Sequence, residues 1–434
     1  GGRLPAKPAS PRSPEVALAK AAGVPPHRQR LLHGGDSALR PDALAAEAGL
    51  EGHGAAVTLV VLPEDMLISA SADHTARLWS ASTGQCLGAL RGHRGWVFGA
   101  ELSPAGDRAL TASQDCTARL WSTSDGGCLH VLSGHSHEVR TAVFSADGSR
   151  VATGSVDKTA KLWCAAGGAC LHTFRGHEHF VHGARFSPAG ARLLTVSEDR
   201  TAKLWDVVEG RCLLTLRGHT EAVSGGAFSA DGAMVVTASR DRTAGVWSAE
   251  SGVCLHWLQG HTGFVRSAEF CARGTHVLTT SSDGSARLWR SADGWGLGSV
   301  SGGEVVSSAS FSPGGDSVAT VTVDGGARLW SVSNPGERIQ TFGASTRVLV
   351  RAPMRVRHAA PLPSVFSPDG ALLLTGNRSE VRLWSVATGA LLHTLPWHSA
   401  EVLALAFAPG FRASAEVEMQ ARSAAERGQA EGVD

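Results

Sequence analysis

The sequence predicts an all-β chain in which about eight four-stranded blades, with seven as the alternative, close into a propeller. The first observation is a periodic tryptophan, whose spacing is 42 residues five times in a row, then 41 and then 54. The tryptophans are Trp79, Trp121, Trp163, Trp205, Trp247, Trp289, Trp330 and Trp384. The second observation is that each unit holds short β-rich runs separated by turn residues. A period near 40 residues is typical of four-stranded units that stack into a ring.

One unit shows why four strands are expected. Its apolar runs are Val139–Phe144, Val151–Thr153, Lys161–Trp163 and Cys170–Leu171. Each run is short, and turn residues such as the Asp-Gly pair at 147–148 separate the first from the second. The same order recurs in the neighbouring units, so one unit predicts the layout of the others.

Polar residues repeat with the tryptophans. A Gly-His pair stands upstream in six units, with the histidines His53, His93, His135, His177, His219 and His261. An Asp precedes the Trp by six residues in seven units: Asp73, Asp115, Asp157, Asp199, Asp241, Asp283 and Asp324. A Ser or Thr lies four residues before each Asp: Ser69, Thr111, Thr153, Thr195, Thr237, Thr279 and Thr320. This four-part pattern resembles the WD-repeat family over roughly residues 66–408.

The resemblance implies that each unit holds a structural tetrad, in which the Trp indole bonds the hydroxyl, the hydroxyl bonds the His and the His bonds the Asp. The predicted sets are His93, Thr111, Asp115 and Trp121; His135, Thr153, Asp157 and Trp163; His177, Thr195, Asp199 and Trp205; His219, Thr237, Asp241 and Trp247; and His261, Thr279, Asp283 and Trp289. A catalytic triad is built once, whereas this set recurs in every unit. We therefore predict no catalytic residue, no cofactor, no metal and no enzyme activity.

The repeat weakens toward its end. Gly303 stands where the seventh unit should carry His, and Arg378 stands where the eighth should carry Asp. Residues 343–360 read as an insertion, and 410–434 as a helical or disordered tail after a propeller spanning 63–409.

The N-terminal segment reads as a different module. Residues 1–13 are rich in Pro, Ser and Gly and are expected to be disordered. Residues 14–62 resemble an incomplete ubiquitin, a small α/β remnant that lacks the opening hairpin; the stretch 23–35 carries most of the likeness.

The ring has two ways to close. Residues 57–62 are either the last ubiquitin-like strand or the first strand of the first blade, and His53 favours the blade. The connection from there to Ser69 is two residues shorter than in later units. If the ubiquitin-like interpretation holds, the strand at 401–407 completes the first blade instead. We favour this closure, which places Leu405 beside Ser69.

Composition narrows the function classes. The chain has 40 Lys and Arg against 39 Asp and Glu, so a broad basic surface for nucleic acid is not expected. No apolar run reaches the roughly 18 residues of a membrane span. Five cysteines recur in register and are expected to be buried packing residues: Cys86, Cys128, Cys170, Cys212 and Cys254. Reduced thiols predict a cytoplasmic location, with the nucleus as the alternative.

The variable positions beside the tetrads form the candidate site. The third residue after each His and the residue before each Asp should line one face of the ring. The candidates there are Trp96, Glu138, Phe180, Phe264, Gln114, Glu198 and Arg240. Exposed aromatics on one face form a recognition cluster; the alternative is that they fill gaps between blades.

These observations predict a non-catalytic scaffold or adaptor that binds proteins or peptides, with no membrane, nucleic acid or small-molecule substrate. By resemblance, the alternatives are a ribosome-assembly factor of the Notchless type, a dynein or cilium assembly factor, and a ubiquitin-ligase substrate receptor. An enzyme with a site in the central channel is the hypothesis from another class. It would need reactive side chains in one blade alone, and none stands out.

Overall fold

The computed structural model describes the ring over residues 65–301, 305–322, 325–342, 364–377, 380–395 and 398–413. It also describes the backbone of three short strands before residue 62. The chain divides into two compact units, Gly1–Glu64 and Asp65–Asp434.

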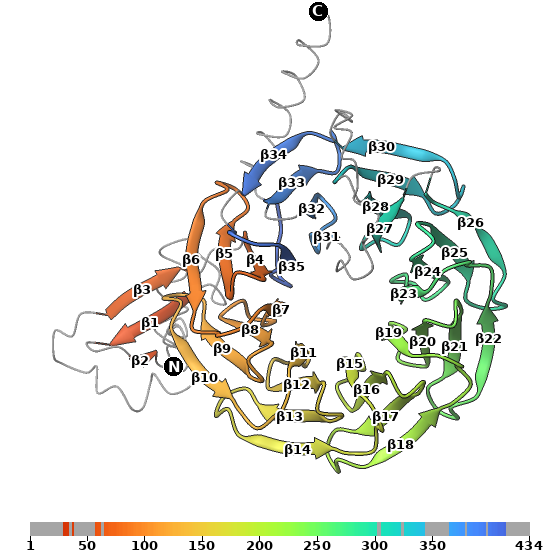
Figure 1. Cartoon of the computed structure of the whole chain (residues 1–434). Helices are drawn as coiled ribbons and strands as arrows, with labels where there is room; N and C mark the ends of the chain where they lie inside the picture. The colour runs from red at the N-terminus through yellow and green to blue at the C-terminus, as the bar shows by residue number, and fades with distance from the viewer. Residues whose placement is uncertain are drawn as a thin grey trace, which may run out of the picture. The chain divides into compact units, whose positions relative to one another are not determined.

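The second unit contains eight four-stranded antiparallel sheets around a central opening (Figure 1). Blade 1 is β35 (Val402–Phe407), β4 (Met66–Ser71), β5 (Thr75–Ser80) and β6 (Cys86–Arg91). Blade 2 is β7 (Val97–Leu102), β8 (Arg108–Ser113), β9 (Ala118–Ser122) and β10 (Cys128–Leu132). Blade 3 is β11 (Val139–Phe144), β12 (Arg150–Ser155), β13 (Ala160–Cys164) and β14 (Cys170–Phe174). Blade 4 is β15 (Val181–Phe186), β16 (Arg192–Ser197), β17 (Ala202–Asp206) and β18 (Cys212–Leu216).

The remaining four blades follow in the same order. Blade 5 is β19 (Val223–Phe228), β20 (Met234–Ser239), β21 (Ala244–Ser248) and β22 (Cys254–Leu258). Blade 6 is β23 (Val265–Phe270), β24 (His276–Ser281), β25 (Ala286–Arg290) and β26 (Gly296–Ser299). Blade 7 is β27 (Val306–Phe311), β28 (Ser317–Thr322), β29 (Ala327–Ser331) and β30 (Arg338–Phe342). Blade 8 is β31 (Ser364–Phe366), β32 (Leu372–Asn377), β33 (Glu380–Ser385) and β34 (Leu391–Leu395).

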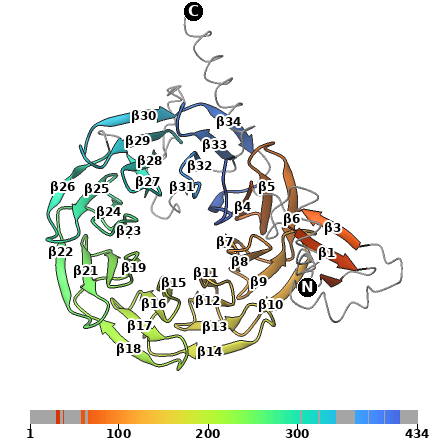
Figure 2. The same ribbon diagram turned by 180° about the vertical axis from the view of Figure 1, so that it is seen from behind.

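The position of a strand within its blade decides its burial. The first strand of each blade lines the central opening and the fourth lies at the outer rim, as both views of the ring show (Figures 1 and 2). The second strands are almost wholly buried, as in β8 and β12, because both of their faces meet a neighbouring blade. Apolar clusters therefore lie between blades, and the one that contains Leu120 and Trp163 joins blade 2 to blade 3.

The ring closes through strands from opposite ends of the chain. β35 pairs antiparallel with β4, and Leu405 lies opposite Ser69. This confirms the closure favoured from the sequence and settles the number of blades at eight. Phe411, which follows β35, is also buried and packs against Phe407 with ring centroids 4.8 Å apart.

The first unit holds one small sheet among its described residues. Its strands are β1 (Gln29–His33), β2 (Ser37–Ala38) and β3 (Val57–Val61), in the order β2-β1-β3. β3 pairs antiparallel with β1 and is not part of blade 1. The tail from residue 414 lies outside the described residues, and the likeness to ubiquitin stays a prediction.

A search of the described residues for a helix long and apolar enough to cross a membrane finds none.

Candidate functional site

The structure brings together each of the five predicted tetrads in blades 2–6. In blade 3, the Trp163 indole donates to Thr153 Oγ1 over 2.9 Å, and His135 Nε2 lies 2.8 Å from the same oxygen. His135 Nδ1 donates to Asp157 Oδ2 over 2.7 Å. The same three contacts span 2.7–2.9 Å in blades 2, 4, 5 and 6.

A fifth residue completes each set. In blade 3, the Thr159 hydroxyl and backbone N–H donate to Asp157 Oδ1 over 2.6 and 3.0 Å, and the Ser136 N–H donates to Oδ2. Sequence reasoning missed this hydroxyl, although a Ser or Thr recurs two residues after the Asp in these blades and in blade 1: Thr75, Thr117, Thr159, Thr201, Thr243 and Ser285.

The hydrogen bonds fix the charge of the aspartate. Burial acts against ionisation of Asp157, yet bonds from His135 and Thr159 hold the pKa of its carboxyl well below its usual range. The side chain of His135 is inaccessible to solvent. A histidine that no substrate can reach, beside a fully bonded carboxylate, supports a structural role.

Blade 1 completes its tetrad across the ring closure. His398 Nε2 lies 2.7 Å from Ser69 Oγ, which also accepts the Trp79 indole N–H over 2.8 Å. His398 Nδ1 lies 3.0 Å from Asp73, whose pKa is lowered to about 2 by hydrogen bonds from Thr75 and His398 in spite of burial. His53, the histidine assigned to this unit from the sequence, lies outside the described residues.

Blades 7 and 8 retain the Trp–Thr bond. The Trp330 indole donates to Thr320 over 2.8 Å, and the Trp384 indole donates to Thr375 over 2.9 Å. Gly303, Asp324 and Arg378 are outside the described residues.

The predicted variable positions meet in pairs. The Gln114 N–H donates to the Trp96 carbonyl over 2.9 Å, and the Glu198 N–H donates to the Phe180 carbonyl over 2.9 Å. In blade 1 the Ala72 N–H donates to the Glu401 carbonyl in the same way, and Glu401 is the third residue after His398. We call the face of the ring that bears these paired positions the loop face.

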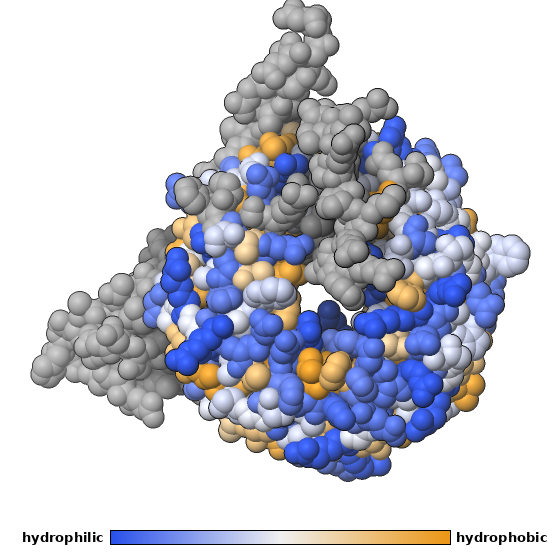
Figure 3. Space-filling model, viewed as in Figure 1, coloured by the Kyte–Doolittle hydropathy of each residue, from blue (hydrophilic) through white to orange (hydrophobic). Residues whose placement is uncertain are grey.

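Three aromatic side chains of the loop face are half exposed. The exposed fractions are 48% for Trp96, 36% for Phe180 and 54% for Phe264. Side chains that filled gaps between blades would be buried, so this exposure favours the recognition hypothesis over the packing alternative. In the view of Figure 3 the ring surface is largely hydrophilic, with separate apolar patches around the central opening.

Two polar clusters accompany these aromatics. In the first, Arg140 Nη2 lies 2.7 Å from Glu138, and its guanidinium stacks 4.4 Å from the centroid of the Phe98 ring. Gln114 donates to Glu138 over 3.3 Å, and Trp96 meets the edge of Phe98. This cluster spans blades 2 and 3. Phe98 and Arg140 were not predicted, although each stands five residues after the tetrad His of its blade, because only the third residue after that His was expected to line the face.

The second cluster spans blades 4 and 5. Arg240 Nη1 lies 2.9 Å from Glu198 Oε1, and the other carboxylate oxygen of Glu198 contacts His182 Nε2. Burial is the main reason that the pKa of His182 is lowered, in spite of Glu198. Both clusters hold charged groups in place beside the half-exposed aromatics.

The repeated cysteines do not pack in the core. Cys86, Cys128, Cys170 and Cys212 are exposed and Cys254 is half-buried, so the prediction of buried packing residues is wrong. They begin the outermost strands, where the fifth residue points inward instead, as Leu132 does in β10.

The outer-strand histidines join neighbouring blades. His130 Nε2 donates to the Ala166 carbonyl over 2.9 Å, and His172 does the same to Val208. Within the described residues, no group of His, Cys, Asp or Glu side chains is arranged to hold a metal ion.

A family model described as "WD domain, G-beta repeat" matches seven stretches of the chain. They are residues 46–80, 84–122, 126–164, 168–206, 210–248, 252–290 and 297–331. The first stretch includes β3, whereas the structure completes blade 1 with β35. The matched stretches do not reach blade 8.

A curated relative matches a short part of the chain. It is the "WD repeat-containing protein pop1" of Schizosaccharomyces pombe, 46% identical over 56 residues. That match covers 13% of this chain and 7% of the relative's length. The family model, by contrast, covers more than half of the residues, and with eight blades and six complete tetrads the chain belongs to the WD domain, G-beta repeat family.

Proposed function

We propose that this protein is a non-catalytic scaffold or adaptor that binds protein partners through the loop face. The observation that carries the proposal is the half-exposure of Trp96, Phe180 and Phe264. Their backbones are tied to the next turn, which limits the entropy lost on binding. Aromatic side chains held in this way are typical anchors of protein interfaces.

The polar clusters supply specificity. Glu138 with Arg140 and Glu198 with Arg240 present both signs of charge within the loop face. Because each charge is already paired, a polymer that carries charge of a single sign gains little by binding here. A partner must instead match two fixed ion pairs. A protein surface with complementary charges fits this pattern.

An enzyme is the weaker hypothesis. The Ser/Thr, His and Asp sets that resemble a triad recur in six blades, and their hydroxyl and imidazole groups are buried, so they serve the fold. WD-repeat propellers are in general non-catalytic platforms.

The experiment is affinity capture with the full chain, in which bound proteins are identified by mass spectrometry. Replacing Trp96 and Phe180 by Ala should abolish capture of the specific partners and leave the melting temperature unchanged. Leu129→Ala on β10 is the matched control, because this side chain is also about half exposed but lies on the outer rim. Capture that survives the double substitution, or a large drop in melting temperature, would contradict the proposal.

The identity of the captured partners would also distinguish between the three alternative functions. Ribosomal proteins would favour the assembly factor of Notchless type, axonemal or dynein proteins would favour cilium assembly, and cullin-type partners would favour a ubiquitin-ligase receptor.

We also propose that residues 14–62 are ubiquitin-like. Strand β1, which carries the Gln-Arg-Leu run, lies between the short strand β2 and the closing strand β3. Hydrogen exchange on the full chain tests this arrangement, since amides of β1 and β3 should be protected together.

A further inference from the structure

Blade 6 departs from the repeat at its outermost strand. β26 begins with Gly296, where the first five blades carry Cys, and its third residue is Gly298. Trp295 precedes the strand, at a place held in the first five blades by Gln85, Gly127, Ala169, Arg211 and Val253. Gly296 and Gly298 therefore leave two side-chain positions empty next to the large side chain of Trp295.

The missing side chains open a groove. Gly296 lies opposite Trp289, and a Cβ on Gly296 would meet the Trp289 ring at 3.3 Å. In blade 1 the equivalent partner of Trp79 is Cys86. Without that side chain, a groove of about 560 Å³ extends along blade 6 toward blade 5.

Blade 5 forms the other wall of the groove, because the large and the small residue of one cross-strand pair have changed places there. In most blades a long basic residue faces a small one across the third and fourth strands, as Lys203 faces Thr215. In blade 5 the order is reversed, and Gly245 faces Trp257. The Trp257 ring packs edge-on against Trp247 and His219, with centroids 5.5 and 4.9 Å away, so it is held rigidly.

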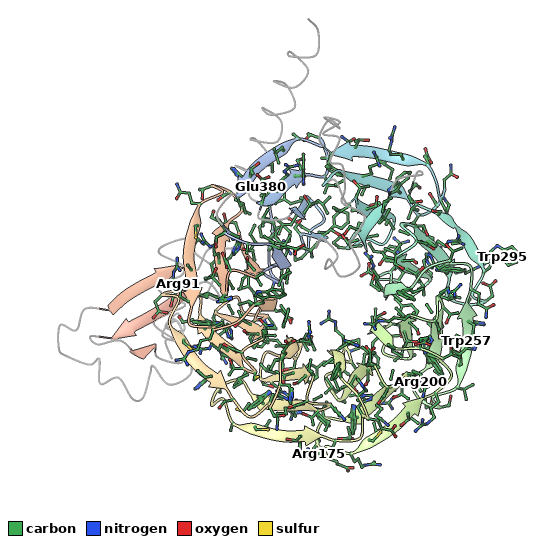
Figure 4. The ribbon with its side chains drawn as sticks, viewed as in Figure 1. Arg91, Arg175, Arg200, Trp257, Trp295 and Glu380 are labelled. Carbon is green, nitrogen blue, oxygen red and sulfur yellow. The ribbon has the colours of Figure 1, made fainter. Side chains whose placement is uncertain are left out.

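The two outer tryptophans lie on neighbouring blades at the same part of the rim, Trp257 in β22 and Trp295 directly before β26 (Figure 4). Trp257 is 37% exposed and Trp295 is 66% exposed. A Trp left so far in solvent forgoes much of the stabilisation that burial of its ring would supply. An aromatic-walled groove that stays open in the free protein is suited to an apolar ligand.

The lining is rich in hydrogen-bond donors. Gln259 and Arg287 line the groove together with the indoles of Trp257 and Trp295. Throughout the described part of the chain, no acceptor is found for either of these two indole N–H groups. Asp293, the carboxylate of the lining, lies 3.2 Å from Arg290.

We propose that this groove binds a proline-rich segment of a partner protein in the polyproline II conformation. Proline offers a flat apolar ring and a carbonyl acceptor but no N–H, so it matches aromatic walls that carry donors. Polyproline II helices dock into aromatic-lined grooves in this way, and their preformed shape limits the entropy lost on binding. Strand addition is the competing mode, and it would require N–H groups on the ligand.

The test is fluorescence polarisation of a labelled decaproline peptide with the full chain. Saturable binding to decaproline is expected, with none to a Gly-Ser peptide of equal length. Trp295→Val introduces the residue found at this place in blade 5, and Gly296→Cys restores the residue of the first five blades. Trp295→Val should weaken binding about tenfold, the loss expected when one aromatic contact is removed. Gly296→Cys should weaken binding to a similar degree, because its side chain would fill the groove beside Trp289.

The controls separate this site from the loop face. Trp96→Ala should leave decaproline binding unchanged, and Trp295→Val should leave capture of loop-face partners unchanged. Because Trp295 is mostly exposed, its substitution should preserve the melting temperature and keep the test valid even if Gly296→Cys perturbs folding. Absence of saturable binding, binding that both variants retain, or a preference for an alternating Thr-Val peptide would overturn the proposal.

Discussion

His398 ties the last strand of the ring to the first blade, and its replacement by Ala should loosen that closure. The imidazole bonds the Asp73 carboxylate and the Ser69 hydroxyl. A hydrogen bond to a charged group is worth about 2 kcal/mol and a neutral one about 1 kcal/mol. The expected loss is therefore about 3 kcal/mol, which corresponds to about a hundredfold change in an opening equilibrium.

Topology makes this loss local. In blade 4, β15 continues directly into β16, so removing His177 weakens a strand that the chain still holds in place. β35 is not connected to β4 through a turn and can detach alone. Hydrogen exchange should therefore accelerate about a hundredfold in β35 and β4 of His398→Ala. The matched His177→Ala variant should show a smaller local increase in β15 and β16. Equal increases in the two variants would refute this account of the closure.

Three further predictions follow from the tetrads and the outer strands. Gly245→Lys should lower the free energy of unfolding by about 1–3 kcal/mol, because a Cβ there would meet the Trp247 ring at 2.7 Å. Adding Trp257→Thr gives blade 5 the Lys–Thr pair found in blade 4 and should recover most of this loss, as measured by urea titration. Stability should fall as the pH is lowered from about 5 toward 2, because the pKa of Asp73 in the folded chain, about 2, lies below its ordinary value of 3.8. The contribution of Asp73 is therefore complete above the unfolded pKa and is lost as the carboxyl protonates in the folded chain. An unfolding midpoint that is unchanged between pH 7 and pH 3 would contradict this. A thiol reagent should modify Cys170 faster than Cys254, because burial raises the pKa of Cys254 to about 11, and mass spectrometry after brief labelling would reveal equal rates if this is wrong.

The repeated parts of the structure could be predicted from the sequence. The spacing of Asp157, Trp163 and their counterparts identified the tetrads, because a chain that repeats a buried network must repeat its spacing. The deficit of one strand in the first unit, together with a spare strand at 401–407, was enough to predict how the ring closes. The hydroxyl of Thr159 was equally regular and was overlooked.

Other features depend on contacts that a periodic pattern does not contain. His398 joins Ser69 across 329 residues, whereas the repeat pattern, which is local, pointed to the nearer His53. The cysteines repeat as regularly as the tetrads, yet a repeat alone does not tell which side of the outermost strand faces solvent. The exchange between Gly245 and Trp257 becomes visible only when the strand register places the two residues opposite each other.

The pairing of β35 with β4 also imposes an order of events during synthesis. β4 leaves the ribosome more than three hundred residues before its partner strand β35, so its edge stays unpaired while seven further blades are made. An exposed strand edge is prone to pair with other chains, and a contact of such long range forms slowly. The nascent chain must therefore keep blade 1 protected until residue 407 emerges, and blade 1 is the last of the eight to be completed.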